Sequence, residues 1–145
     1  MERLICLVIG YICGLFQTGY IYGKLHHIDI RQHGSGNAGT TNALRTLGWK
    51  AGVITFLGDC LKCVFAVFVA WLLFGKSHER MFELLAMYAG VGAVLGHNFP
   101  FYLQFKGGKG IAATAGILLA VNPKVAIVAY LTFIVIVVAT RYVSL

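Results

Sequence analysis

Charged residues are scarce in this chain of 145 residues: Asp and Glu together number five, and charged residues of both signs make up only 12%. Hydrophobic residues make up 59%, and the mean hydropathy is +0.79. A soluble domain of this size could not cover its surface with so few polar side chains. The composition therefore excludes an ordinary soluble domain and indicates a polytopic helical membrane protein.

No complete set of metal ligands is present either. The four cysteines all lie in apolar runs, and the CxxC formed by Cys60 and Cys63 has no second pair or nearby histidine to complete a zinc site. The remaining cysteines are Cys6 and Cys13. We therefore expect no metal and no cofactor, and we interpret the thiols as small packing residues of helices.

The net charge of +7 comes without a basic helix or a basic and aromatic stripe, so nucleic acid is not an expected partner. The cationic residues lie in loops, where they suit anionic headgroups or phosphorylated substrates. The first apolar run has no small-x-small cleavage site, so we expect a retained membrane span and not a removed signal.

Five apolar runs are candidate membrane segments. They are Leu4 to Leu25, Ala51 to Phe74, Met81 to Gly96, Ile111 to Val121 and Val125 to Ala139. The last two are short and are separated by Asn122-Pro123-Lys124, which favours two tilted helices with a turn, although a single kinked span is the alternative. We expect an all-α membrane bundle of about five segments that forms one domain over residues 1–145.

The second run contains two opposite charges, Asp59 and Lys62. A charge at membrane depth costs about 2.5 to 3.5 kcal/mol and is normally paired or functional. At spacing i, i+3 the two side chains share one helix face and can neutralise each other. They form either a packing ion pair or a support for a polar loop.

A polar segment between the first two runs suits an anion. Glycines at three positions permit positive φ and converging amide groups, short polar side chains add donors, and Arg45 offers a planar fork for phosphate oxygens. The segment comprises Gly34, Ser35, Gly36, Asn37, Ala38, Gly39, Thr40, Thr41, Asn42, Ala43, Leu44 and Arg45. A short helix from about Thr40 to Leu47, capped by Asn37 or Thr40, would direct its positive end at this turn. An ordinary glycine-rich turn is the alternative.

A second segment of the same kind follows the third apolar run. It begins with Gly96-His97-Asn98-Phe99-Pro100 and ends with Lys106-Gly107-Gly108-Lys109-Gly110, just before the next apolar run. Two lysines around a glycine-rich backbone form a second candidate anion site. The Walker pattern is not met, because Leu103 replaces the first glycine and Gly110 replaces Ser or Thr, so nucleotide hydrolysis is not expected.

The distribution of basic residues predicts the orientation. One side would carry Lys24, Arg31, Arg45, Lys50, Lys106, Lys109 and Arg141, and the other Arg3, Lys76, Arg80 and Lys124. Both glycine-rich loops therefore face the cytoplasm, provided that the last two segments cross separately.

Two phosphate-sized sites on one side suggest two phosphorylated ligands, with catalysis by positioning and charge stabilisation. A covalent route has little support, because Ser35 lacks a Gly-x-Ser-x-Gly context. The acid and base candidates are Asp29, Asp59, His33 and His97. His97 is best placed, although a histidine that only binds a backbone carbonyl is equally consistent.

Four motifs together resemble one family: Gly34 to Asn42, Gly58-Asp59-x-x-Lys62, Gly96 to Pro100 and Lys106 to Gly110. The chain resembles, over essentially its whole length, the acylphosphate:glycerol-3-phosphate acyltransferases of bacteria. The resemblance implies a multi-pass enzyme of the bacterial cytoplasmic (inner) membrane, in contact with the lipid bilayer. It would transfer a fatty acyl group from acyl phosphate to glycerol 3-phosphate, giving lysophosphatidic acid and phosphate in the first acylation of phospholipid synthesis, without a metal.

The resemblance also implies roles for individual residues. Catalytic roles fall to Ser35, Asn37, Lys106 and His97, and supporting roles to Asp59 and Lys62. Substrate binding falls to Gly34, Gly36, Gly39, Thr41, Asn42, Arg45, Gly107, Gly108, Lys109, Gly110 and Ser144. We expect direct attack of the glycerol hydroxyl on the acyl carbonyl, with a substrate phosphate or His97 taking the proton.

Two departures from the family pattern stand out. Cys63 replaces a glycine, which we expect to alter packing more than chemistry. The family's third polar block, with His, Asn, Arg and Glu, does not occur in these 145 residues. We therefore expect a C-terminally truncated chain with the fold of the first part and little turnover.

Two other classes of membrane protein share some of these features. Acyltransferases with a His-x4-Asp dyad are excluded, because no histidine is followed by Asp at that spacing. A phosphate or anion transporter, or a subunit of one, is the alternative function, but no internal repeat is evident and both candidate sites fall at one interface.

Overall fold

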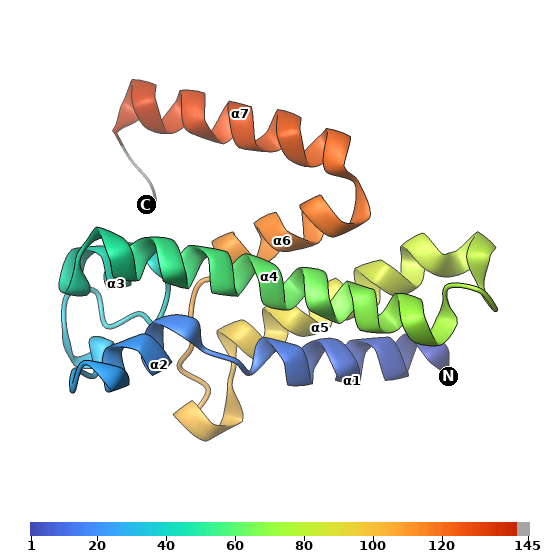
Figure 1. Cartoon of the computed structure of the whole chain (residues 1–145), viewed down its shortest axis with the longest axis horizontal. Coiled ribbons are helices and arrows are strands. Elements are labelled where there is room, and N and C mark those ends of the chain that lie inside the picture. Colours follow the sequence, from blue (N-terminus) through green and yellow to red (C-terminus); the bar gives the residue numbers. More distant parts are fainter. Residues whose placement is uncertain (142–145) are drawn as a thin grey trace.

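The computed structural model describes residues 1–141, which form helices and short 3-10 turns and contain no strand. Figure 1 shows the long helices lying roughly along one axis, with the short helices α2 and α3 at one end. The α-helices are α1 Glu2–Gly14, α2 Thr18–Leu25, α3 Thr40–Leu47, α4 Trp49–Phe74, α5 Phe82–Asn98, α6 Ile111–Val121 and α7 Pro123–Thr140. The 3-10 turns are η1 Ile30–Gln32, η2 Glu79–Met81 and η3 Phe101–Leu103.

Within residues 1–141, four segments are long and apolar enough to cross a membrane: Glu2–Leu25, Trp49–Phe74, Glu79–Leu103 and Pro123–Thr140. The helix Ile111–Val121 is apolar but shorter. The all-α bundle of about five membrane segments is thus confirmed.

The first span is not the continuous helix expected from Leu4 to Leu25. It divides into α1, which ends at Gly14, and α2, which begins at Thr18. The backbone carbonyls at the break are taken by side chains from other helices: Tyr102 donates to Leu15 O at 2.6 Å and Lys62 donates to Phe16 O at 2.7 Å. An interrupted helix is tolerated at membrane depth because neighbouring side chains satisfy its freed polar groups.

Glycines bring α1 and α5 into direct backbone contact. A Cβ atom built on Gly10 would lie 2.0 Å from Ala89 O, and one on Gly96 would lie 2.2 Å from Tyr11 O. No larger side chain fits between the two helices, which is the packing that small residues allow in membranes. Gly14 and Gly92 make close approaches of the same kind, to Ala93 O and Leu7 O.

The last two apolar runs form separate helices, as expected. Asn122 ends α6, and its Oδ1 accepts a hydrogen bond of 3.2 Å from Val125 N at the start of α7. Figure 1 shows α7 turning back along the bundle from this point. The alternative of one kinked span is therefore wrong, and α7 returns toward the end of the bundle that carries α3.

Helix α6 begins about halfway along α4 in Figure 1. Contacts with Cys60, near the middle of α4, fix this depth: Cys60 Sγ donates to Ala112 O at 3.0 Å, and a Cβ on Gly116 would lie 2.3 Å from Cys60 O. The second glycine-rich loop therefore reaches into the bundle, and the polar site lies below the level of the helix ends.

This topology predicts which loops share a side of the membrane. Single cysteines at exposed Gln32 and Gln104 should react with an impermeant maleimide from the same side, and a cysteine at exposed Ser77 from the opposite side. Labelling of intact and opened vesicles measures this, with the unsubstituted protein as the background for the native thiols. Labelling of positions 32 and 104 from opposite sides would contradict the arrangement.

Candidate active site

The two glycine-rich loops meet around one cavity of about 260 Å³. The first loop and α3 form one wall, and the start of α6 with Lys109 and Gly110 forms another. The lining residues are Ser35, Asn37, Gly39, Thr40, Thr41, Asn42, Arg45, Phe56, Asp59, His97, Lys109, Gly110, Ile111, Ala112 and Phe133. The prediction of two separate phosphate-sized sites is thus refined into one shared cavity.

Two helix N-termini face this cavity. Helix α3 starts after Gly39 and α6 after Gly110, and neither start has a capping side chain. The first backbone N–H groups of a helix have no partner within the helix, and the helix dipole adds positive potential there. With Arg45 and Lys109 also in the lining, the cavity has the electrostatics of an anion site.

Asn42 holds the first loop in shape. Its side-chain amide is buried and donates to Ile30 O at 2.8 Å, His33 O at 3.1 Å and Asn37 O at 2.9 Å. Its Oδ1 accepts from Ser35 N at 3.0 Å. Because these contacts occupy both ends of the amide, the Asn42 side chain shapes the loop. Asn42 also lines the cavity, and its role in substrate binding stays a prediction.

Asn37 and Gly34 also determine the conformation of the first loop. Asn37 Oδ1 accepts from Gly39 N at 2.9 Å, directly before α3, so it supports the helix start but does not cap the helix. Gly34 has φ +58°, and a Cβ there would lie 2.3 Å from Asn42 Oδ1. This position therefore requires glycine on both conformational and steric grounds.

An ion pair outside the membrane spans anchors the start of the loop. Arg31 donates to both carboxylate oxygens of Asp29, at 3.0 and 2.8 Å, and its guanidinium lies 4.7 Å from the Tyr20 ring centroid. These hydrogen bonds lower the pKa of Asp29 from 3.8 to about 2. Since the folded-state pKa is lowered, the stability that this pair contributes is present above pH 4 and is lost as the pH falls through about 2.

The second loop is fixed to the end of α5. Gly107 N donates to Asn98 O at 3.1 Å and Gly108 N donates to His97 O at 3.0 Å. A Cβ on Gly107 would lie 2.0 Å from His97 O, and one on Gly108 would lie 2.0 Å from His97 Nε2. These two glycines are needed because the loop backbone lies directly against His97.

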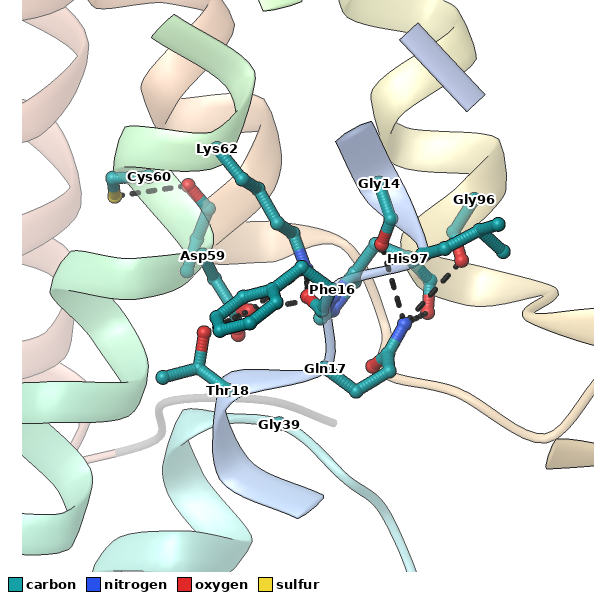
Figure 2. A network of polar contacts seen from close by, with 12 residues as sticks. Gly14, Phe16, Gln17, Thr18, Gly39, Asp59, Cys60, Lys62, Gly96 and His97 are labelled. Atoms are coloured by element: carbon teal, nitrogen blue, oxygen red, sulfur yellow. Dashed lines mark hydrogen bonds and ion pairs between the residues drawn. The ribbon is translucent and has the colours of Figure 1, made fainter. Parts of the chain in front are cut away.

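A buried polar network lies behind the cavity (Figure 2). Lys62 donates to Asp59 Oδ1 at 2.9 Å, and His97 Nδ1 lies 2.7 Å from Lys62 Nζ. Thr18 adds a longer contact of 3.5 Å to Asp59 Oδ1, whereas the buried Asp59 Oδ2 has no hydrogen-bond partner in residues 1–141. Asp59 and Lys62 thus form a buried ion pair, and Asp59 also lines the cavity. Their support of a polar loop stays a prediction.

Gln17 was missed by the sequence analysis. Its buried side-chain amide donates to Gly96 O at 3.3 Å and His97 O at 2.9 Å, which joins the break in the first span to the end of α5. A lone glutamine inside an apolar run was the available signal, since a polar side chain at membrane depth needs a partner.

The remaining site residues of the sequence analysis fall into three groups. The structure brings Ser35, Asn37, Gly39, Thr41, Arg45, His97, Lys109 and Gly110 into the cavity lining. It leaves Gly34, Gly36, Lys106, Gly107 and Gly108 outside the lining, with Lys106 exposed to solvent. Ser144 lies outside the described residues.

The fold and the site together define a class: a multi-pass membrane protein with a recessed, cationic, glycine-lined cavity. Residues 4–145 match the model of the family described as glycerol-3-phosphate acyltransferase. The chain belongs to this family of integral membrane acyltransferases, as the sequence motifs had indicated.

Similar proteins support the same assignment. A glycerol-3-phosphate acyltransferase of Alkaliphilus metalliredigens is 48% identical over all of this chain and 71% of its own length. One from Bacillus subtilis is 43% identical over 96% of this chain and 69% of its own. The glycerol 3-phosphate form of PlsY (YgiH), a solved integral membrane glycerol 3-phosphate acyltransferase, superposes with a TM-score of 0.85 at 36% identity. The superposition covers 99% of this chain and 69% of that one. Nothing in these comparisons supports the transporter alternative.

The contact between Gly108 and His97 predicts a severe effect of one methyl group. Gly108→Ala should displace the loop or the imidazole, destabilise the protein by about 1 to 3 kcal/mol and lower activity. Thermal unfolding in detergent and acyl-transfer rates measure this, with the exposed Gln104→Asn as the control in the same segment. Gly108→Ala with unchanged stability and rate would show that the close approach is not maintained.

Proposed function

We propose that this protein transfers a fatty acyl group from acyl phosphate to the hydroxyl of glycerol 3-phosphate, giving lysophosphatidic acid and inorganic phosphate. The convergence of two uncapped helix N-termini on one cationic cavity carries this proposal. A site of this kind suits phosphate groups, and both substrates carry one. The solved PlsY structures, one in a glycerol 3-phosphate form and one in a lysophosphatidic acid form, support the acceptor and the product.

The cavity also has an apolar wall for an acyl chain. Phe56 of α4, Ile111 of α6 and Phe133 of α7 line it and are at least partly exposed. Because these residues lie on membrane segments, an acyl chain can lie among the helices while its phosphate stays between the two helix starts. This arrangement favours a donor that carries its phosphate directly on the acyl group.

The expected reaction is direct attack of the glycerol hydroxyl on the acyl carbonyl. The new C–O bond forms, the bond between the carbonyl carbon and the phosphate oxygen breaks, and the hydroxyl proton leaves with the phosphate. Ser35, Asn37 and Lys109 line the cavity and would stabilise the developing charge. The exposed Lys106 would contribute at the entrance, and Arg45 would hold the second phosphate.

We also propose that the enzyme works in the cytoplasmic membrane of a bacterium with its cavity open to the cytoplasm. The relatives named above come from bacteria, and the basic residues gather at the end of the bundle that carries the loops. Water-soluble glycerol 3-phosphate would then enter from the side on which the loops lie.

An assay with purified protein in lipid vesicles tests the donor. Acyl phosphate with glycerol 3-phosphate should yield lysophosphatidic acid at a low but measurable rate, whereas acyl-CoA should not replace acyl phosphate. Because the attack is direct, acyl phosphate alone should leave no labelled acyl group on the denatured protein. Activity with acyl-CoA, or a stable adduct on Ser35 or a cysteine, would contradict the proposal.

The charges in the lining predict a graded loss of phosphate binding. Lys109→Ala should lower kcat/KM by roughly 30-fold or more, because a charge-assisted contact to phosphate is lost. This factor corresponds to about 2 kcal/mol or more of transition-state stabilisation. Lys109→Arg should also be harmful, because a planar fork does not reproduce the contacts that a compact ammonium makes with phosphate in a glycine-rich turn. Lys76→Ala, exposed at the other end of α4, is the matched control. An equal response of both alanine variants would remove Lys109 from the site.

A further inference from the structure

Lys62 has one acceptor for each of its three ammonium hydrogens. They are Phe16 O at 2.7 Å, Asp59 Oδ1 at 2.9 Å and His97 Nδ1 at 2.7 Å. The Lys62 side chain is only 5% exposed and that of Asp59 only 1%. A buried ammonium is stable only when its charge is paired and its donors are satisfied, and here both conditions are met.

This geometry fixes the proton of His97. Nδ1 lies 2.7 Å from the Lys62 ammonium, which can only donate, so Nδ1 must be the bare, accepting nitrogen. The alternative partner, Asp59 Oδ1, is 3.6 Å from Nδ1, too far for a normal hydrogen bond. Neutral imidazole carries one proton, which is therefore on Nε2.

Within residues 1–141, the Nε2–H group has no hydrogen-bond acceptor. The His97 side chain is only 3% exposed and lines the cavity. The ring lies against Gly108, where the absence of a side chain leaves Nε2 next to the loop backbone. A donor in this place suits a phosphate or carbonyl oxygen of a ligand. It does not suit a hydroxyl that must lose a proton.

We propose that Lys62 is a positioning residue that holds His97 as the Nε2–H tautomer, so that His97 donates a hydrogen bond to the phosphorylated ligand and does not act as the base. Lys62 acts only through His97 and does not touch substrate. The hydroxyl proton then leaves with the phosphate, which is the other acceptor that the sequence analysis had left open. The role of His97 in the reaction and the kinetic test rest on the proposed acyl transfer, whereas the tautomer of His97 and its response to phosphate do not.

Nitrogen NMR of 15N-histidine-labelled protein in lipid vesicles tests the tautomer without any turnover. The chain has five histidines, so the signals of His97 are identified as those that disappear in the variant His97→Asn. Asparagine is chosen because its Oδ1 can replace Nδ1 as the acceptor for Lys62. The expected result is a bare Nδ1 and a protonated Nε2, with the Nε2 signal shifting when glycerol 3-phosphate or inorganic phosphate is added. A protonated Nδ1, or an Nε2 signal insensitive to both compounds, would overturn the proposal.

A double-mutant cycle then tests whether Lys62 acts through His97. Lys62→Met and His97→Asn should each lower kcat by about 100-fold, the size of a misplacement effect. The double variant should be no slower than the slower single variant, because residues that act as one unit are not additive. Losses that multiply would show that Lys62 serves the site by another route.

A fallback variant covers the case in which Lys62→Met does not fold with Asp59 left unpaired. Replacing the whole pair, Asp59→Leu with Lys62→Met, removes both charges, and such replacements are often neutral or stabilising. The Nδ1 signal of His97 should then lose its hydrogen-bond shift, and an unchanged signal would overturn the proposal. A protein with the expected tautomer but no acyl transfer would instead refute the proposed function and leave this inference intact.

Discussion

The structure depends on satisfying one ammonium group inside a membrane. Lys62 binds the carbonyl of Phe16 at the break in the first span, Asp59 on its own helix and His97 at the end of α5. Three membrane segments are thus joined at one point. Unpaired polar groups are costly at this depth, so the break between α1 and α2, the position of α4 and the end of α5 are fixed together. The network also fixes His97, against which the backbone of the second glycine-rich loop packs.

The cavity in front of this network takes its positive potential from both backbone and side chains. The starts of α3 and α6 direct free amide groups into it, and Arg45 and Lys109 add full charges at its edge. Because α6 begins near the level of Cys60, the site is partly shielded from bulk water, where electrostatic interactions are stronger than at an open surface. Such depth is also typical of transporter sites, so the family assignment, and not the depth, decides between the two functions.

Much of this was predictable from the sequence. Hydropathy predicted the membrane segments, and Gly, Asn and Lys patterns predicted both loops and the pairing of Asp59 with Lys62, because these features are local in the chain. The break near Gln17 was not predictable, since its cause is long-range: Gln17 contacts carbonyls of residues 96 and 97. For the same reason the sequence did not predict that Asn42 also holds the loop through its contacts with residues 30, 33 and 37.

The spacing of Asp59 and Lys62 also bears on how the protein is made. Their contact lies within a single helix, one turn apart, so the charges can neutralise each other as soon as α4 forms. Helix α4 can therefore enter the bilayer before α5 has been synthesised, without carrying two unpaired charges at about 2.5 to 3.5 kcal/mol each. His97 joins later and occupies a donor that the ion pair leaves free. The order of synthesis along the chain thus matches the order in which the network can be assembled.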